Sequence, residues 1–455
     1  MSSAGSPETE ELRRVLGPLD AACVVIGAII GVGIFFTPTD VAALAGSGSL
    51  ALLTWALGGA IALLGALTFA ELGGLHTRSG GQYDILRDAY GALPAFVYVF
   101  CNATAIQAGA VAIIAVVCVR NLSLVCVGHL PGAGAEAVLA AVLIAGLVGA
   151  NGAGVRWGAS IQNATVLAKL ATLALVALLA VLWGGEPVAT VERTAAAPPG
   201  PTSPVLALVF AGLVPALFSF GGWQHALWIG GEIREPQRNV PRAIVGGVLV
   251  VIVVYLLANW AYLRLLGYEG VRDSQALAAD AVAAVWPQGG GRIVAAAVAL
   301  SALGVLNAQF LSGPRLLFAM ARDGRFFRPF AHVSERFKTP FGAIVLIGCA
   351  ALVLLFGAGE QRVRRLLTGV VFIDVFFFVL TGLAVIVLRH KRPDVARPAR
   401  VPLYPLVPLL FVAGELCALV GAHVNPDHRI AAFIGAGWIV GAALCYVVFF
   451  RSRPA

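Results

Sequence analysis

Long apolar runs, separated by short polar segments, follow one another from about residue 18 to residue 450. Each run contains roughly 20 residues, which is enough for an α-helix to cross about 30 Å of hydrocarbon. The pattern predicts twelve membrane-spanning helices, at 18–45, 49–74, 93–120, 134–151, 157–183, 204–231, 242–266, 290–320, 341–358, 364–388, 403–423 and 430–450. We therefore expect an all-α polytopic membrane protein.

Composition excludes a soluble helical protein. Of the 455 residues, 59% are hydrophobic and 12% are charged, whereas about 25% of the residues of a soluble domain are charged. The first 17 residues are polar and acidic, and they lack the basic start followed by an apolar core that a signal peptide has. They predict a cytosolic tail and not a cleaved signal peptide.

The basic residues indicate the orientation of the chain. With both termini in the cytosol, 21 of the 31 Lys and Arg residues lie inside, nine lie outside, and Lys169 lies within a span. This bias follows the positive-inside rule and predicts a multi-pass protein of the cell (plasma or inner) membrane. The same bias accounts for the net charge of +8. A nucleic-acid partner is not indicated, because the basic residues form no patch with interleaved aromatics.

Glycines interrupt the first span at GAIIGVGIF, residues 27–35. Each glycine in a helix interior lowers the stability of the helix by about 1 kcal/mol relative to alanine. The motif is typical either of close helix packing or of an unwound segment that lines a cavity. A second interruption, ALFSFGGWQHALWIGGEI at 216–233, lies in the sixth span. The two interrupted spans are five helices apart, so spans 1–5 and 6–10 could be two copies of a repeat. An odd number of spans per copy would place the two copies in opposite orientations across the membrane. Paired breaks of this kind point to a transporter binding site.

The ends of such half-helices have defined chemistry. A half-helix that begins near Ile34 presents free N–H groups and a positive dipole end, which suit an anion. Half-helices that end near Ile29 and Phe218 present carbonyl groups, which suit a cation. A site with both fits the carboxylate and the ammonium of an α-amino acid.

Five motifs carry a family resemblance: GAIIGVGIFFTP, the run from TWALGG to SGGQYDILRDAYGALPAFVY, FSFGGW, GEIREPQRNVPRAI and LRHKRPDVARPARVPL. They resemble the amino acid–polyamine–organocation superfamily, and most of all the L-type amino acid transporters and their bacterial relatives. The resemblance covers about residues 16–405, and the last two spans are compatible with it. It implies the leucine-transporter-type fold, a 5+5 inverted repeat with broken helices 1 and 6 plus two extra helices.

This implied architecture divides the chain into seven parts. They are a cytosolic N-terminal tail at 1–17, the first repeat (helices 1–5) at 18–183, an extracellular loop at 184–203, the second repeat (helices 6–10) at 204–388, a cytosolic basic loop at 389–402, helices 11–12 at 403–450 and a C-terminal tail at 451–455.

The resemblance also implies how substrate binds. The carboxylate meets the N–H groups of Val32 and Gly33, and the ammonium meets carbonyl groups of Ile29 and Phe218, with Ser219 as a further contact. Relatives usually carry serine or a small residue where this chain has Val32, so a hydroxyl contact is missing here. Phe218 matches an aromatic gate that closes over the substrate from outside. The predicted substrate-binding residues are Ile29, Gly31, Val32, Gly33, Phe218, Ser219, Gly221 and Trp223. Ordinary packing is the alternative for the two aromatics.

Lys169 lies within the fifth span. On insertion scales a lysine at a helix centre costs about 2.5–3.5 kcal/mol. Its ammonium either snorkels to the cytosolic interface or, as the resemblance implies, substitutes for the sodium that coupled relatives bind between helices one and eight. The eighth span offers one central hydroxyl, Ser301, where a sodium site needs an adjacent pair. We therefore expect sodium-independent transport and no metal.

Three further polar residues are candidates for specificity or proton transfer. Asp374, within the tenth span, is a functional candidate by its depth in the membrane. It could contact a polar or cationic substrate group, carry a proton, or bond to backbone. Gln107 and His225 are expected to face the same cavity, and His225 is either a packed, hydrogen-bonded side chain or a proton relay.

The sequence thus predicts a secondary active amino acid transporter that uses no cofactor and no nucleotide. Sodium-independent exchange of neutral amino acids by alternating access is the main hypothesis. Proton-coupled symport, facilitated diffusion, and transport of cationic amino acids or polyamines are the alternatives. A channel would need a continuous polar file and an enzyme a clustered catalytic set, and neither pattern is present in the sequence.

One possible protein partner follows from the resemblance. Eukaryotic L-type carriers pair with a heavy chain through a cysteine in an outside loop, and Cys126 falls in a predicted outside loop. However, 28 Arg against 3 Lys, with abundant Ala, indicates GC-rich coding DNA and a bacterial source. We therefore expect no heavy-chain partner, and the amino acid and the lipid bilayer as the partners.

Overall fold

The chain is all-helical in the computed structural model, which describes residues 14, 16–77, 80–152, 159–183, 205–332, 339–359, 362–424 and 426–451. In these ranges the one β-type pairing is an isolated bridge between Leu16 and Ile233. The predicted loop 184–203, nearly all of the N-terminal tail and residues 452–455 lie outside the described ranges. The all-α class is confirmed.

Nine of the twelve predicted spans are helical segments long and apolar enough to cross a membrane, counted over the described residues. The other three coincide with shorter apolar helices, so every predicted span overlaps a helix. The membrane-type helices are α1 (Pro18–Ile29), α3 (Gly48–Leu75), α5 (Ala92–Cys101) continued by η2 (Asn102–Ile106) and α6 (Gln107–Cys126), α7 (Ala133–Gly152), α8 (Ala159–Trp183), α9 (Val205–Phe220), α11 (Pro236–Asp273), α13 (Gly290–Arg322), α14 (Phe341–Gly357), α15 (Arg362–Lys391), α16 (Leu406–Val424) and α17 (Pro426–Phe449).

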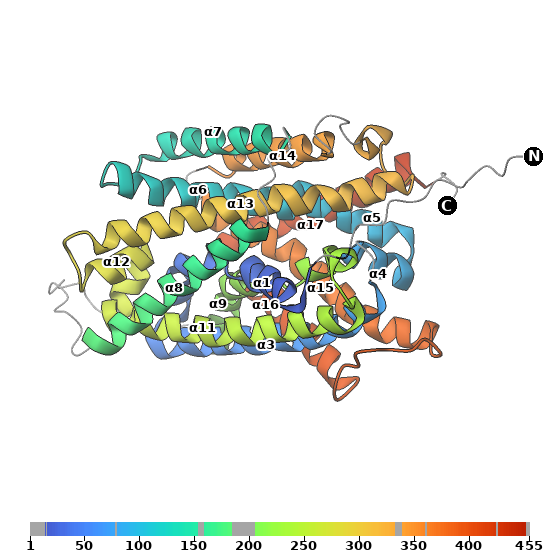
Figure 1. Cartoon of the computed structure of the whole chain (residues 1–455), viewed down its shortest axis with the longest axis horizontal. Helices are drawn as coiled ribbons and strands as arrows, with labels where there is room; N and C mark the ends of the chain where they lie inside the picture. The colour runs from blue at the N-terminus through green and yellow to red at the C-terminus, as the bar shows by residue number, and fades with distance from the viewer. Residues whose placement is uncertain are drawn as a thin grey trace, which may run out of the picture.

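Most of the long helices run along one direction, and α1 lies in the middle of the bundle (Figure 1). Helices α7 and α14 pack together on one side, and α3 and α11 pack together on the other. The short helices α4 (Gly81–Tyr90) and α12 (Leu277–Ala283) lie at opposite ends of the bundle (Figure 1). We use them below to name the α4 end and the α12 end.

Several predicted span boundaries differ from the helix ends by a few residues, as at the third span. The third span does not stop at residue 120, because α6 continues to Cys126. Cys126 is therefore the last residue of a helix and not a loop residue, although it is exposed as a loop residue would be. The division into two inverted repeats stays a prediction.

The first span is interrupted where its glycines stand. Helix α1 ends at Ile29, residues 33–35 form the short 3-10 turn η1, and α2 (Thr37–Ala45) resumes the run. Pro38 occupies the first turn of α2, where its missing N–H costs no hydrogen bond. The glycine motif therefore marks an unwound segment, and not helix packing alone.

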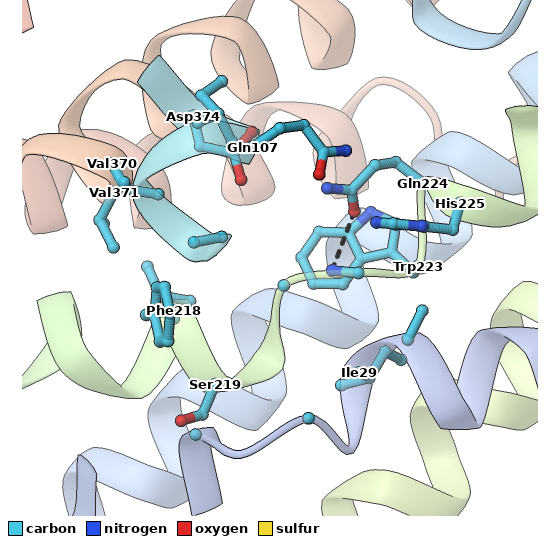
Figure 2. Close-up of a pocket in the computed structure, with 18 of the residues that line it drawn as sticks. Ile29, Gln107, Phe218, Ser219, Trp223, Gln224, His225, Val370, Val371 and Asp374 are labelled. Carbon is cyan, nitrogen blue, oxygen red and sulfur yellow. Dashed lines mark hydrogen bonds between the residues drawn. The ribbon is translucent and has the colours of Figure 1, made fainter. Parts of the chain in front are cut away.

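The sixth span is interrupted in a similar way. Helix α9 ends at Phe220, a turn follows, and the single-turn helix α10 (His225–Trp228) begins after it. Within the turn Gly222 has φ +127°, a value that residues with a side chain rarely adopt. The Gln224 side chain accepts a hydrogen bond from the Gly222 N–H at 2.9 Å, which fixes the turn (Figure 2).

Glycine allows the two interruptions to touch. A Cβ added to Gly33 would lie 2.5 Å from Ser219 Oγ, and one added to Gly222 would lie 2.7 Å from the carbonyl oxygen of Ala28. Each interruption therefore places a glycine against the other one. This mutual approach brings backbone that is not part of a regular helix to the centre of the bundle.

Candidate functional site

A central cavity of about 100 Å³ lies where the two interruptions meet. Figure 2 shows Ile29 and Ser219 on its lower side and Asp374 and Gln107 on the opposite side. The lining includes all eight predicted substrate-binding residues together with Gln107, His225 and Asp374. The sequence-predicted residues are thus brought together, with the exception of Lys169, and their roles stay predictions.

The unwound segment of the first span offers unused hydrogen-bond donors. The N–H groups of Val32 and Gly33 bond to no group in the described part of the chain. Both residues line the central cavity, just before helix α2. Free N–H groups at such a position attract a negative charge.

The carbonyl side of the same segment is already engaged. The Ile29 carbonyl oxygen accepts bonds from the Gly31 N–H at 2.7 Å and from the Tyr255 hydroxyl at 2.9 Å. The Tyr255 hydroxyl, on α11, also lies 3.1 Å from the Ser219 carbonyl oxygen. Tyr255 therefore ties the two interruptions together. Sequence reasoning missed it, since one tyrosine in an apolar run carries no mark of this contact.

Ser219 is held by its neighbours in the other interruption. Its hydroxyl lies 2.6 Å from Thr37 Oγ1, and Thr37 donates to the Gly33 carbonyl oxygen at 3.0 Å. Since the Thr37 proton goes to Gly33, Ser219 is the donor to Thr37. The Ser219 side chain therefore braces the junction of the two segments.

The aromatic residues of the second interruption differ in their surroundings. Phe218 is half-buried, with its ring 6.2 Å from that of Phe36, and it projects at one side of the cavity (Figure 2). Trp223 is 1% exposed and stacks on Phe378 at 5.1 Å between ring centroids. Trp223 packs against Phe378 and also lines the cavity, so the structure is compatible with both interpretations of this residue, packing and pocket lining. A gating role for Phe218 stays a prediction.

Lys169 is buried behind the first interruption. It is 2% exposed, and its Nζ donates to the Gly27 carbonyl oxygen at 3.4 Å. This burial contradicts snorkelling to an interface. The contact joins α8 to the end of α1, as the resemblance implies for the first helix. A link to the eighth span stays a prediction, and Ser301 there is buried with no hydrogen-bond partner among the described residues.

The wall opposite the interruptions is polar. Asp374 makes no hydrogen bond to any described residue, which argues against the structural role that its sequence allowed. The cavity also reaches Glu415 on α16, which sequence reasoning missed. A carboxylate within an apolar run was the available signal, the same one that identified Asp374.

Ion pairs join several elements at the α4 end. Arg87 of α4 contacts Asp323, just after α13, at 3.2 Å, and the Tyr83 hydroxyl donates to the same carboxylate at 3.1 Å. Burial raises the pKa of Tyr83 to about 12, so its hydroxyl stays a donor at neutral pH. Glu232 lies 3.1 Å from Arg315 of α13. These contacts hold α4 and the segment that contains Glu232 against the end of α13, at the α4 end of the bundle.

A buried glutamate anchors the loop that precedes α16. Both carboxylate oxygens of Glu71 accept bonds from Arg389, at 2.9 and 2.6 Å, and Glu71 also accepts from the Val401 N–H at 2.8 Å. Glu71 and Glu232, near the cytosolic ends of the second and sixth predicted spans, are thus both paired with arginines.

A larger side cavity of about 480 Å³ extends from the central cavity toward Glu232 and Arg315. The two cavities share four lining residues, which are Ala28, His225, Val305 and Gln309. The His225 ring packs 4.1 Å from that of Trp228. The two cavities therefore adjoin at these four residues.

Comparison with known proteins agrees with this geometry. Residues 16–450 match the family model described as amino acid permease. The chain is 31% identical over 427 residues to the b(0,+)-type amino acid transporter 1 of Mus musculus, covering 92% of this chain and 84% of that protein. It is 30% identical over 415 residues to the serine/threonine exchanger SteT of Bacillus subtilis (strain 168), covering 90% and 92%. It is 31% identical over 432 residues to the large neutral amino acids transporter small subunit 2 of Rattus norvegicus, covering 90% and 78%.

The matched region includes both interruptions, the central cavity and the polar wall. A multi-pass helical bundle with a cavity between two unwound segments is typical of secondary transporters. The chain belongs to the amino acid permease family, and it is a membrane transporter of amino acids.

Proposed function

We propose that this transporter is a sodium-independent exchanger of neutral amino acids that works by alternating access. The observation that carries the proposal is the pair of unpartnered N–H groups, at Val32 and Gly33, beside a central cavity. The substrate carboxylate binds these donors. Its ammonium binds beside the carbonyl groups of Ile29, Phe218 and Ser219, and it shares those of Ile29 and Ser219 with the Tyr255 hydroxyl.

The neutral class is supported by apolar lining around Phe218. Val370, Val371 and Ile106 line the central cavity, and Figure 2 shows the two valines above Phe218. Relatives named as a serine/threonine exchanger and as a large neutral amino acids transporter support both exchange and a neutral substrate.

For the architecture we propose the 5+5 inverted repeat with the divisions given above. Both termini then face the cytosol, and the α4 end is the cytosolic end of a protein of the cell membrane. The side cavity is the inner pathway, and Phe218 is the gate toward the outside. The substrate and the bilayer are the partners, without a heavy chain.

Lys169 supports the sodium-independent mechanism. Its ammonium lies against the Gly27 carbonyl, next to the end of α1 where a bound cation would act. A second cation beside it would be repelled. Transport should therefore be equal in sodium and in choline buffers, and Lys169→Ala should slow it sharply. Stimulation of the unmodified protein by a sodium gradient would show that Lys169 has another role.

The test of exchange uses purified protein in proteoliposomes. Labelled amino acid should enter vesicles preloaded with unlabelled amino acid, and empty vesicles should load little at any pH gradient. A panel of labelled amino acids identifies the substrate. Loading of empty vesicles under an inward proton gradient would instead establish proton symport. Symport is the second candidate because Asp374 faces the cavity without a hydrogen-bond partner in the described chain.

A further inference from the structure

The ion pair of Glu232 and Arg315 differs from that of Glu71 and Arg389. Glu71 is 1% exposed and accepts bonds from Arg389 with both of its oxygens. In contrast, Glu232 Oε1 lies 3.1 Å from Arg315 Nη1 but accepts no well-aligned hydrogen bond from a described residue. The Glu232 and Arg315 side chains are 20% and 46% exposed. A partly exposed pair of this kind contributes little to stability, so it can open to admit other charges.

This ion pair lies in the wall of the side cavity. Among the described residues of that wall, Glu232 is the one carboxylate, and Arg315 is the one arginine or lysine. The cavity volume of about 480 Å³ falls within the range of about 300–1,000 Å³ that is typical of small-molecule sites. Two opposite charges in the wall of such a cavity suit a small molecule with one negative and one positive group.

Apolar side chains line the same cavity close to Glu232. The main chain of Leu16 is fixed beside Glu232, because the Leu16 N–H donates to the Glu232 carbonyl oxygen at 2.9 Å. The Arg234 N–H donates to the Leu16 carbonyl oxygen, also at 2.9 Å. Leu16 and Ile229 both line the cavity. They offer an apolar surface on which the aliphatic part of a ligand can be buried.

Polar side chains of α13 extend from the ion pair to the central cavity. Gln309 lines both cavities, and its side-chain oxygen is buried with no partner in the described part of the chain. Ser312 and Arg315 line the side cavity as well. These residues follow one another at intervals of three along α13, which makes them neighbours on one face of the helix. A zwitterion between the two cavities would meet polar groups along this face.

We propose that the side cavity binds a second amino acid, whose α-carboxylate lies on Arg315 and whose α-ammonium lies on Glu232. Each charge of the amino acid replaces the partner that the protein's own ion pair supplies, and a guanidinium group bonds a carboxylate with two parallel donors. The apolar side chain lies against Leu16 and Ile229. This inference rests on the proposed function, because it takes the side cavity as the inner pathway. The second site is where an amino acid from the cytosol waits before it enters the central cavity.

The test counts the molecules of labelled L-norleucine that bind to one chain of detergent-purified protein at saturation. The parent protein should bind two, one in each cavity. Glu232→Gln and Arg315→Gln should each weaken the second molecule at least about tenfold, because its ammonium or its carboxylate loses a charged partner. The affinity of the first molecule should stay within about twofold, since its contacts are separate.

Asp323→Asn is the matched control. It breaks the ion pair with Arg87, which also joins an element to the end of α13, but Asp323 does not line the side cavity. This variant should still bind two molecules. If Glu232→Gln, Arg315→Gln and Asp323→Asn all bind two molecules, or all bind one, the pair of Glu232 and Arg315 only holds elements together, and the proposal is overturned.

Analogues that lack one charge test the chemistry of the site. Hexanoate is norleucine without the ammonium, and pentylamine is norleucine without the carboxylate. Both should displace the second labelled molecule at least about tenfold more weakly than unlabelled norleucine does. Equal displacement by hexanoate would assign the cavity to apolar carboxylates in general, and equal displacement by pentylamine would assign it to apolar amines. Either result would overturn the proposal.

The two levels of inference fail in different ways. Exchange of norleucine by a parent protein that binds only one molecule would overturn the second site and leave the proposed function standing. Absence of amino acid exchange would overturn the proposed function. The second site would still be decided in Gly33→Ala, where the added Cβ forces the two interruptions apart. That variant should bind one molecule, and adding Glu232→Gln should remove it. Binding of none by Gly33→Ala, or of one by the double variant, would overturn the second site.

Discussion

The two walls of the central cavity present different kinds of chemical group. The wall made by the two interruptions uses main-chain groups, and it is held in shape by contacts such as Tyr255 to Ile29 and Ser219 to Thr37. The opposite wall uses side chains, and Glu415 and Gln107 are left with unpartnered oxygens among the described residues. Main-chain groups can recognise only what all amino acids share. The side-chain wall is where one amino acid can be distinguished from another.

This comparison predicts two classes of variant. Changes in the main-chain wall should affect all amino acids about equally, because each presents the same carboxylate and ammonium. Changes in the side-chain wall should alter the preference among amino acids. Selectivity is thus a more informative measurement than the rate alone.

The largest effect is expected for Gly33→Ala. The added Cβ would lie 2.5 Å from Ser219 Oγ and 3.2 Å from Ser219 Cα, so the two interruptions must separate. A displacement of about 1 Å in a binding site can cost roughly a hundredfold. We expect a loss of that order for every substrate in the exchange assay.

Gly246→Ala is the control for this substitution. Gly246 lies within α11, and an added Cβ would meet nothing within 4 Å. Its transport should match that of the unmodified protein. If Gly33→Ala exchanges normally, close contact of the interruptions is not needed for transport.

Phe218→Ala should come next. Phe218 is half-buried beside the cavity, so its removal should open the gate more than it destabilises the fold. We expect exchange to slow by about tenfold, with a smaller change in thermal stability. Phe356→Ala, in α14, is the control because Phe356 is 54% exposed and does not line the cavity. An unchanged exchange rate in Phe218→Ala would refute the gate.

The main-chain wall was more predictable than the side-chain wall. The interruptions leave a local signature, glycines in an apolar run, and all eight residues that the family resemblance assigns to them line the cavity. Glu415 and Tyr255 reach the site only through packing of α16 and α11 against other helices. Such contacts join residues that are distant in sequence. The hydropathy pattern identifies the spans but not which face of each span turns inward.

The same reasoning applies to the spans themselves. The predicted end of the third span, at residue 120, was too early, because the polar stretch RNLS at 120–123 is helical and α6 continues to Cys126. Hydropathy reports where a helix leaves hydrocarbon and not where its hydrogen bonding ends. Lys169 differs, since its place in an apolar run marked it as a candidate, and the family resemblance implied the contact with the first helix that the structure has at Gly27.

The smallest effect is expected for Tyr255→Phe, which tests how the main-chain wall keeps its shape. The substitution removes the hydroxyl shared by the Ile29 and Ser219 carbonyl oxygens and changes little else. A lost hydrogen bond of this kind is worth about 1 kcal/mol, or roughly fivefold in an equilibrium constant. We expect about that loss of apparent affinity, equal for all amino acids. Tyr262→Phe is a close control, because the Tyr262 hydroxyl is equally buried on the same helix and has no partner among the described residues. Tyr262→Phe should bind normally. A loss in Tyr255→Phe that differed between amino acids would break the comparison, since it would show that the main-chain wall also selects among side chains.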